Sequence, residues 1–127
     1  LALATTAVDA LTSGQLLVVD DLTAYLHTEL GRTIIDWFTD PTVNQTGAQL
    51  IFTTHDIALM DIGRGPIRNR ERIWFTEKNS AKATMLYQLS DFTSLQARSN
   101  ITKNYLEGRF GATTYTCPSL IHHLLAN

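Results

Sequence analysis

Two short stretches decide the fold that this sequence predicts: Leu16-Leu17-Val18-Val19-Asp20-Asp21 and Gln49-Leu50-Ile51-Phe52-Thr53-Thr54-His55-Asp56. Each contains an unbroken apolar run, which is typical of a strand that is buried on both faces of a parallel sheet. Each run is followed by polar side chains that would lie at the carboxyl end of its strand. The intervening segment is long enough for the helical crossover that parallel neighbours need. The two stretches therefore predict a strand–helix–strand unit.

Helical patterns occur on both sides of the first stretch. Leu1–Leu11 spaces its apolar residues as one buried stripe, and Gly14 follows as a natural helix stop. Thr28–Phe38 also has helical spacing and ends near Asp40-Pro41. A short helix is expected over Asp56–Ile62. These segments supply the crossover and a helix that precedes the first strand.

The second half of the chain predicts a hairpin. Arg72–Glu77 is expected to form a third strand and Thr84–Leu89 a fourth, with a turn at Asn79-Ser80. The two strands would be antiparallel because only about five residues separate them. Asp91–Leu106 is expected to be helical in pieces. The whole pattern predicts an α/β fold, with parallel strands joined by right-handed helical crossovers and an antiparallel edge hairpin.

Composition indicates a single globular domain. The chain has 127 residues, of which 44% are hydrophobic and 17% charged, enough for one core and too few for two comfortable domains. No apolar run approaches the ~20 residues of a membrane helix, and no secretory signal is expected. The lone Cys117 fits a reducing cytoplasm. Four aromatic residues are expected in the core: Trp37, Phe38, Trp74 and Phe75.

Charge is unevenly distributed along the sequence. The net charge is −2, yet the chain through Ile62 holds eight acidic residues and one arginine, whereas Gly63–Lys82 holds six basic residues and two acidic ones. A basic stretch of this kind can meet phosphate, a nucleic acid backbone or an acidic partner. Such stretches are more often solvated loops. The charge pattern alone therefore does not decide whether the chain binds nucleic acid.

The residues after the two predicted strands indicate a catalytic site. Carboxylates at the carboxyl end of a parallel strand project into the crevice where α/β proteins bind ligands. In a nucleotide hydrolase, Asp20 would hold Mg²⁺, which prefers oxygen ligands, and Asp21 would orient or deprotonate the attacking water. His55, at the end of the neighbouring strand, would reach the same crevice and bond a γ-phosphate or the water.

These segments, taken in order, resemble the ABC-type P-loop ATPases, and more closely the bacterial AAA-family ATPases of the abortive-infection, anti-phage kind. Leu16–Leu22 is similar to their Walker B strand, Phe52–Asp56 to their switch-histidine loop, and Arg72–Lys78 to the strand that follows. Tyr105–Ala112 is similar to their C-terminal motif. The D-loop of the family is matched by Tyr25, Leu26 and His27.

The resemblance implies ATP binding and hydrolysis with Mg²⁺, driving or gating a defence effector protein. Asp20 would be the metal ligand, Asp21 the catalytic acid, and His55 a catalytic and nucleotide-binding sensor of the γ-phosphate. The D-loop would face a second subunit, which implies a homodimer or larger homo-oligomer. Residues 1–127 would form one partial domain, the C-terminal half of the ATPase fold. The start at Leu1 rather than Met fits a piece of a longer protein.

Several departures keep a second hypothesis open. Asp21 stands where the family has glutamate, and Tyr25 and Thr28 stand where serine and proline are usual. No Gly-x-x-x-x-Gly-Lys-Ser/Thr motif occurs, so the phosphate cradle is missing and this chain alone is expected to be inactive. Leu11–Gln15 imitates an ABC signature but abuts the strand directly, so it is a decoy. The alternative is a catalytically degenerate interaction module that binds a partner without turnover. A Mg²⁺-dependent nuclease would need further carboxylates.

Overall fold

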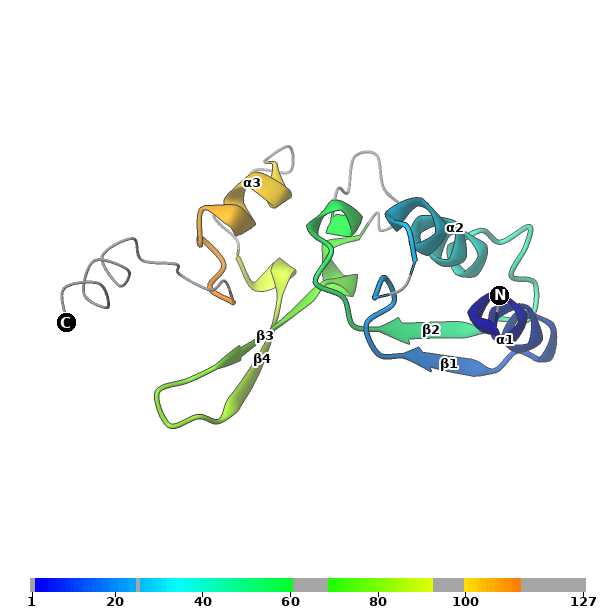
Figure 1. Ribbon diagram of the computed structural model, residues 1–127, viewed down its shortest axis with the longest axis horizontal. Helices are drawn as coiled ribbons and strands as arrows, with labels where there is room; N and C mark the ends of the chain where they lie inside the picture. Colours follow the sequence, from blue (N-terminus) through cyan, green and yellow to red (C-terminus); the bar gives the residue numbers. More distant parts are fainter. Residues whose placement is uncertain (1, 25, 61–68, 93–99, 113–127) are drawn as a thin grey trace, which may run out of the picture. The chain divides into compact units, whose positions relative to one another are not determined.

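The computed structural model describes residues 2–24, 26–60, 69–92 and 100–112, which divide into two compact units, Leu1–Arg70 and Glu71–Asn127 (Figure 1). The single partial domain expected over residues 1–127 stays a prediction. Tyr25, Cys117 and the end of the expected short helix after Met60 lie outside the described residues. No helix in the described part of the chain is both long and apolar enough to cross a membrane.

The first unit contains the predicted strand–helix–strand arrangement. Strands β1 and β2 pair in parallel, from Leu16 opposite Gln49 to Val19 opposite Phe52. Helix α1 contacts β1 and α2, and α2 contacts β2 (Figure 1). The elements are α1 (Ala2–Ser13), β1 (Leu16–Val19), α2 (Thr28–Thr39), β2 (Gln49–Phe52) and the 3₁₀-helix η1 (Ile57–Met60). The parallel pairing and the helical crossover are thus confirmed.

Helix α1 ends at Ser13 because Gly14 adopts a left-handed conformation, with φ of +67°. The amide of Gln15 then donates to the carbonyl of Ala10 at 3.0 Å. A hydrogen bond between residues five apart is typical of a helix that ends in a left-handed glycine. Thr46 donates its hydroxyl to the carbonyl of Leu11 at 2.6 Å. Gly14 is therefore a helix stop, and β1 begins two residues later, with no helix between them.

The crossover helix α2 packs closely on the turn that follows β1. A Cβ atom at Gly31 would lie 3.0 Å from Cγ2 of Thr23 and 3.9 Å from Cδ2 of Leu22. Leu22 is only 1% exposed, and Ile34 and Ile35 of α2 are buried as well. The helix thereby fixes the start of the segment that carries the candidate site.

The loop between α2 and β2 is closed by one side chain. Asn44 donates from Nδ2 to the carbonyl oxygens of Phe38, at 2.9 Å, and Ala48, at 2.8 Å. Its Oδ1 accepts from the amide of Ala48 at 2.9 Å. Since these bonds join the last turn of α2 to the residue before β2, Asn44 fixes how the crossover returns to the sheet.

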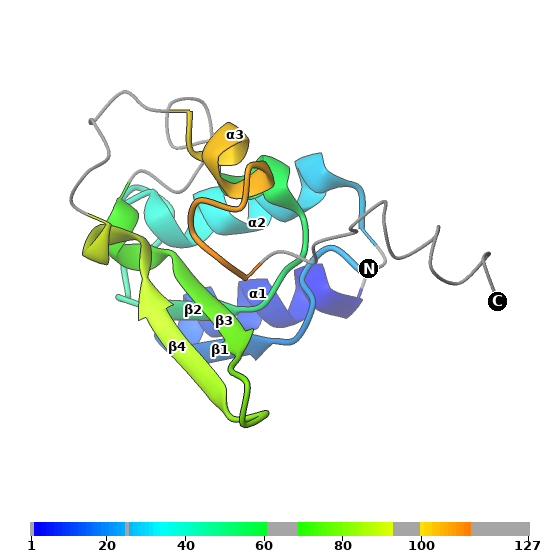
Figure 2. The ribbon, with the colours of Figure 1, turned by 90° about the vertical axis from the view of Figure 1, so that its left-hand side faces the viewer.

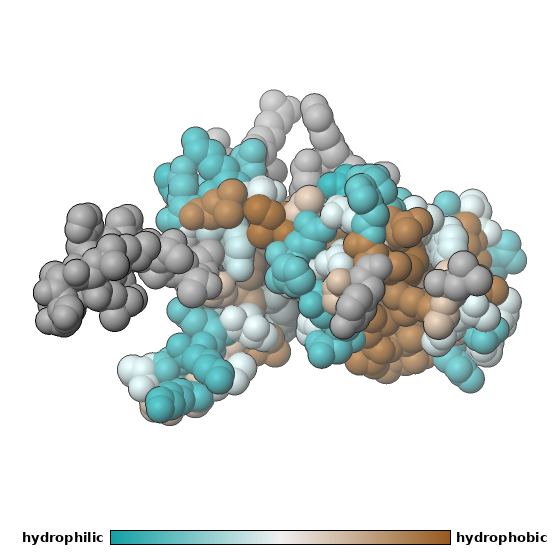
Figure 3. Space-filling model, viewed as in Figure 1, coloured by the Kyte–Doolittle hydropathy of each residue, from teal (hydrophilic) through white to brown (hydrophobic). Residues whose placement is uncertain are grey.

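The expectation that both strands are buried on both faces is wrong for the described structure. Leu16, Val18 and Ile51 are 53%, 66% and 57% exposed, whereas Leu17 and the other alternate residues are half-buried. Successive strand residues point to opposite faces, so one face of this sheet carries exposed apolar side chains. Figure 3 shows apolar surface gathered over this unit.

The second unit is built on the predicted antiparallel hairpin, which is confirmed. Trp74 pairs with Gln88, and the register continues to Lys78 opposite Thr84 (Figure 2). The third strand begins later than expected because a 3₁₀ turn occupies its predicted start. The elements are η2 (Arg70–Arg72), β3 (Trp74–Lys78), β4 (Thr84–Gln88), η3 (Leu89–Asp91) and α3 (Ile101–Leu106). Among the described strands the hairpin forms a two-stranded sheet of its own, so its predicted place at the edge of the parallel sheet is wrong.

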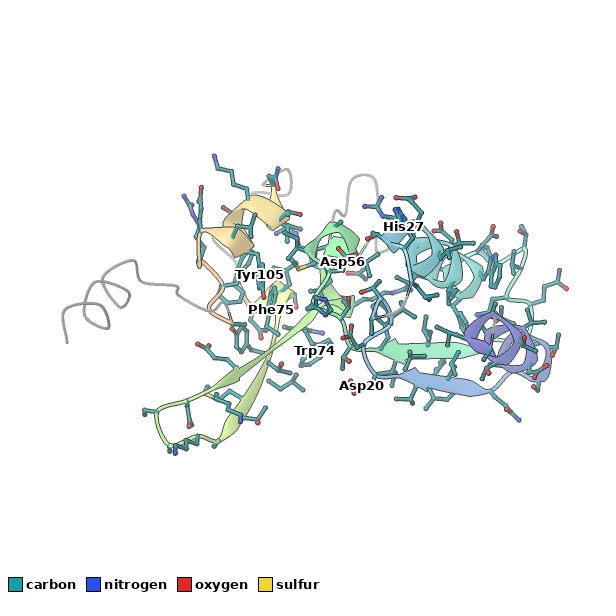
Figure 4. All side chains as sticks on the ribbon, in the orientation of Figure 1. Asp20, His27, Asp56, Trp74, Phe75 and Tyr105 are labelled. Carbon is teal, nitrogen blue, oxygen red and sulfur yellow. The ribbon has the colours of Figure 1, made fainter. Side chains whose placement is uncertain are left out.

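An aromatic cluster forms the core of the second unit. Phe75 is buried and stacks on Tyr105 and Phe110, with ring centroids 5.6 Å and 5.5 Å apart (Figure 4). Tyr87 donates its hydroxyl to the carbonyl of Phe110 at 2.5 Å. Trp74, however, is 52% exposed, so its predicted place in the core is wrong. Adjacent strand residues cannot both point inward, and Phe75 takes the inner face.

Candidate functional site

The site lies where β1 and β2 end. The parallel pairing continues one step beyond both strands: the amide of Thr53 donates to the carbonyl of Val19 at 3.0 Å, and the amide of Leu22 donates to the carbonyl of Thr53 at 2.9 Å. The segments that follow the two strands are therefore held together by backbone hydrogen bonds. This is the arrangement that parallel pairing predicts for the residues after Val19 and Phe52.

Asp20 is the first acid after β1 and is exposed (Figure 4). Its Oδ1 accepts a hydrogen bond of 2.6 Å from the hydroxyl of Thr53, on the neighbouring segment. Among the described residues, Oδ2 of Asp20 makes no hydrogen bond of its own. One carboxylate oxygen is therefore positioned by the protein, and the other has no hydrogen-bond partner within the described residues.

Asp21 has an unusual backbone conformation, with φ of +52°. Left-handed residues other than glycine are uncommon, and aspartate and asparagine tolerate this region better than most. The Asp21 amide donates to the Thr53 hydroxyl at 2.8 Å, and its carbonyl accepts from the amide of Ala24 at 3.0 Å. The tight turn after β1 thus favours aspartate at a position where the resembling family has glutamate.

His55 lies beside the second acid. Its Nδ1 is 3.2 Å from Oδ1 of Asp21, and the two side chains are 78% and 41% exposed. That Oδ1 atom is itself shielded from solvent and makes no well-aligned hydrogen bond within the described residues. The ring nitrogen of His55 is therefore its close polar neighbour. The structure brings Asp20, Asp21 and His55 to one end of the sheet, while their catalytic roles stay predictions.

The expected D-loop is described only in part, because Tyr25 lies outside the described residues. Leu26 is half-buried, and its amide donates to the carbonyl of Thr23 at 3.3 Å. His27 is exposed and caps α2: its Nδ1 accepts from the amide of Glu29 at 3.3 Å (Figure 4). His27 thus has a local structural role, and its part in any subunit contact stays a prediction.

Hydroxyl groups hold the two segments together, and sequence reasoning missed them. The hydroxyls of Thr23 and Thr54 are 3.0 Å apart, and Thr54 also accepts from the amide of Asp56 at 3.0 Å. Asp56 in turn accepts from the hydroxyl of Thr28 at the start of α2. The only signal in the sequence was the repeated threonine before His55, a residue type too common to stand out.

The donor set suits a magnesium ion that is shared with a phosphate ligand rather than a cage made by the protein. No group of three or more His, Cys, Asp or Glu side chains in the described part of the chain could hold a metal ion. Mg²⁺ commonly takes one or two carboxylates, several waters and substrate phosphate oxygens. The exposed carboxylate of Asp20 fits that requirement.

The basic stretch that begins at Gly63 is described only from Asn69 onward.

In open α/β sheets, ligands bind at the carboxyl ends of the parallel strands, and Asp20, Asp21 and His55 lie at that end of β1 and β2. The family model described as "AAA domain, putative AbiEii toxin, Type IV TA system" matches residues 1–61, just under half of the chain. The chain is similar to that family over the part that holds β1, α2 and β2. No curated protein and no solved structure matches the chain. The match supports a nucleotide-binding, ATPase-like function in general terms.

Proposed function

We propose that this chain is the Walker B, D-loop and switch-histidine part of an ABC-type AAA ATPase, which binds and hydrolyses ATP. One observation carries the proposal: parallel pairing of β1 with β2 places Asp20, Asp21 and His55 at one end of the sheet. The family similarity over residues 1–61 covers all three of them. The triphosphate cradle would come from residues outside this sequence, so the activity belongs to the full-length protein.

Each of the three side chains has a distinct task under this proposal. Asp20 offers an exposed carboxylate to Mg²⁺, which would neutralise charge on the phosphates when bound. Asp21 orients the attacking water and withdraws its proton. His55 donates a hydrogen bond toward the γ-phosphate, where negative charge develops during transfer. Its Nδ1 lies 3.2 Å from Oδ1 of Asp21, so the ring is close to the second acid.

The partners follow from the same proposal. The segment Tyr25–His27 would face a second subunit, as D-loops do in ABC-type enzymes, and hydrolysis would drive or gate an anti-phage effector protein in the cytoplasm. The exposed side chain of His27 supports the placement of this segment at a contact with a second subunit. The apolar face formed by Leu16, Val18 and Ile51 would pack against the half of the ATPase fold that carries the phosphate cradle.

A second candidate function is a degenerate module that binds a partner without turnover. The specific observation in its favour is that Oδ1 of Asp21 is shielded from solvent with His55 beside it, so a water molecule has restricted access to that atom. The exposed apolar face of the sheet would then serve the partner. This candidate predicts nucleotide-independent binding and no hydrolysis.

Removal of the Asp21 carboxylate in the full-length protein tests the proposal. Asparagine is the appropriate replacement because it tolerates φ of +52° as well as aspartate does. Asp21→Asn is expected to lower single-turnover ATP hydrolysis by at least a hundredfold, on the order of the effect of losing a general base, while ATP binding is retained. Asp36→Asn on the exposed side of α2 is the matched control and should hydrolyse ATP at the wild-type rate.

Two further variants test the length of the acidic side chain at position 21 and the role of His55. Asp21→Glu adds one methylene and is expected to speed hydrolysis, because a misplacement of about 1 Å costs on the order of a hundredfold in rate. The same variant should have a lower unfolding free energy than the wild type, because glutamate tolerates φ of +52° less well than aspartate. His55→Ala should lower kcat far more than it weakens ATP binding, since its contact forms with the transferring group. If Asp21→Asn hydrolyses ATP as fast as the wild type, Asp21 is not the catalytic acid and the interaction module is the better explanation.

A further inference from the structure

We propose that Thr53 is a positioning residue that sets the geometry of both acids through a single hydroxyl group. Its Oγ1 donates to Oδ1 of Asp20 at 2.6 Å and accepts from the amide of Asp21 at 2.8 Å. The inference rests on the proposed function, because it concerns how Asp20 is presented to a magnesium–nucleotide complex. It assigns a role to a residue that neither the sequence motifs nor the family match singled out.

The direction of the two hydrogen bonds is fixed by their chemistry. A backbone amide can only donate and an ionised carboxylate can only accept, so the one hydroxyl proton of Thr53 must point at Asp20. Hydrogen bonds in such a chain polarise one another, and a bond to an ionised oxygen is stronger than one between neutral groups. The rotamer of the Asp20 carboxylate is therefore coupled to the backbone of Asp21.

Thr53 is itself held in place on both sides. Its amide donates to the carbonyl of Val19 and its carbonyl accepts from the amide of Leu22, and these are the last backbone bonds between the two segments within the described residues. A β-branched side chain on a fixed backbone has few rotamers, so the hydroxyl needs little further ordering. Oγ1 of Thr53 is therefore positioned between the two acids without a bound ligand.

The same hydroxyl links the acids to the histidine. By accepting from the Asp21 amide, Thr53 holds the peptide group between Asp20 and Asp21 and supports the left-handed turn at Asp21. That turn brings Oδ1 of Asp21 to 3.2 Å from His55, which follows Thr53 by two residues. Loss of the hydroxyl would free the Asp20 carboxylate and the Asp21 turn together.

Neighbouring Thr54 provides a matched comparison. Its hydroxyl also makes two hydrogen bonds, one with the hydroxyl of Thr23 and one accepted from the amide of Asp56, but neither involves Asp20 or Asp21. Thr53→Val and Thr54→Val therefore remove the same group, one residue apart on one segment. Thr53→Ser keeps the hydroxyl and removes only the methyl group.

The experiment titrates Mn²⁺ into the full-length protein in the presence of a non-hydrolysable ATP analogue, with free Mn²⁺ read by electron paramagnetic resonance and compared with the same titration of the analogue alone. Thr53→Val is expected to raise the half-saturating Mn²⁺ concentration about tenfold, which corresponds to about 1.4 kcal/mol. Thr53→Ser and Thr54→Val should stay within about twofold of the wild type. Exchange of the Asp21 amide proton, followed by NMR without ligand, should be at least about tenfold faster in Thr53→Val alone.

The outcomes separate this inference from the proposed function. A wild-type protein that binds no Mn²⁺ with the analogue refutes the proposed function and, with it, the role of Thr53 toward the metal. Wild-type binding beside an unchanged Thr53→Val overturns the Thr53 proposal alone. A Thr53→Ser variant as impaired as Thr53→Val also overturns it, because the methyl group rather than the hydroxyl would then be responsible.

Discussion

The Asp21→Gly variant should be more stable to unfolding than the Asp21→Ala variant, which is the reverse of the usual order. Both replacements remove the carboxylate and its contact with His55, so the difference between them isolates the backbone. At φ of +52° a Cβ atom crowds the following carbonyl, which costs about 1–2 kcal/mol in the left-handed region. Glycine avoids this strain but loses about 0.5–1 kcal/mol more conformational entropy on folding. We therefore expect Asp21→Gly to exceed Asp21→Ala in unfolding free energy by about 0.75 kcal/mol, the difference between the midpoints of the two ranges.

Urea unfolding of the two variants measures that difference, and Thr76 in β3 supplies the control. Thr76 is exposed within a regular strand, where glycine should be the less stable replacement by about 0.5–1 kcal/mol. The sign of the glycine–alanine difference should therefore reverse between the two positions. If alanine is the more stable replacement at both, Asp21 is not held in a strained turn, and the explanation for aspartate in place of glutamate is wrong.

Two further predictions concern the second unit and the crossover. Burial and the nearby charge of Glu77 raise the pKa of Tyr87 from 10.0 to about 12. The folded state therefore holds this proton more tightly, and the resulting stability is full below pH 10 and lost as the pH rises to about 12; urea unfolding at pH 9 and pH 11 should show a smaller loss in Tyr87→Phe than in the wild type, and an equal loss would contradict this. Asn44→Ala should lower the unfolding free energy by about 2 kcal/mol, because the amide of Ala48 loses its acceptor. Gln45→Ala, which removes one exposed bond of 3.1 Å, is the control and should change stability far less.

The order and pairing of the elements could be predicted because they depend on local patterns. Apolar runs, helical spacing and turn residues identified β1, α2, β2 and the hairpin. Exposure could not be predicted in the same way. An unbroken apolar run indicates that both faces of a strand carry apolar side chains, but whether the face that holds Val18 is covered depends on what packs there. The prediction that Trp74 lies in the core was wrong for a related reason, since only one of two adjacent residues in a strand can point to the inner face.

The candidate site was predictable to the level of strand ends. Parallel pairing makes the residues after Val19 and Phe52 neighbours, so the proximity of Asp21 and His55 follows from the fold. The Thr53 hydroxyl and the left-handed turn could not be predicted. Both depend on atomic positions after folding, and threonine and aspartate are common in every kind of turn.

The side-chain clamp at Asn44 has a consequence for how the length of this protein can change during evolution. Its bonds to Phe38 and Ala48 span a fixed number of residues, so an insertion or deletion between them would break the clamp and shift the start of β2. The exposed turn at 79–82, by contrast, closes on itself through Asn79 and lies far along the chain from the acids. Homologous sequences should therefore keep one length between α2 and β2 and vary in length at the hairpin turn.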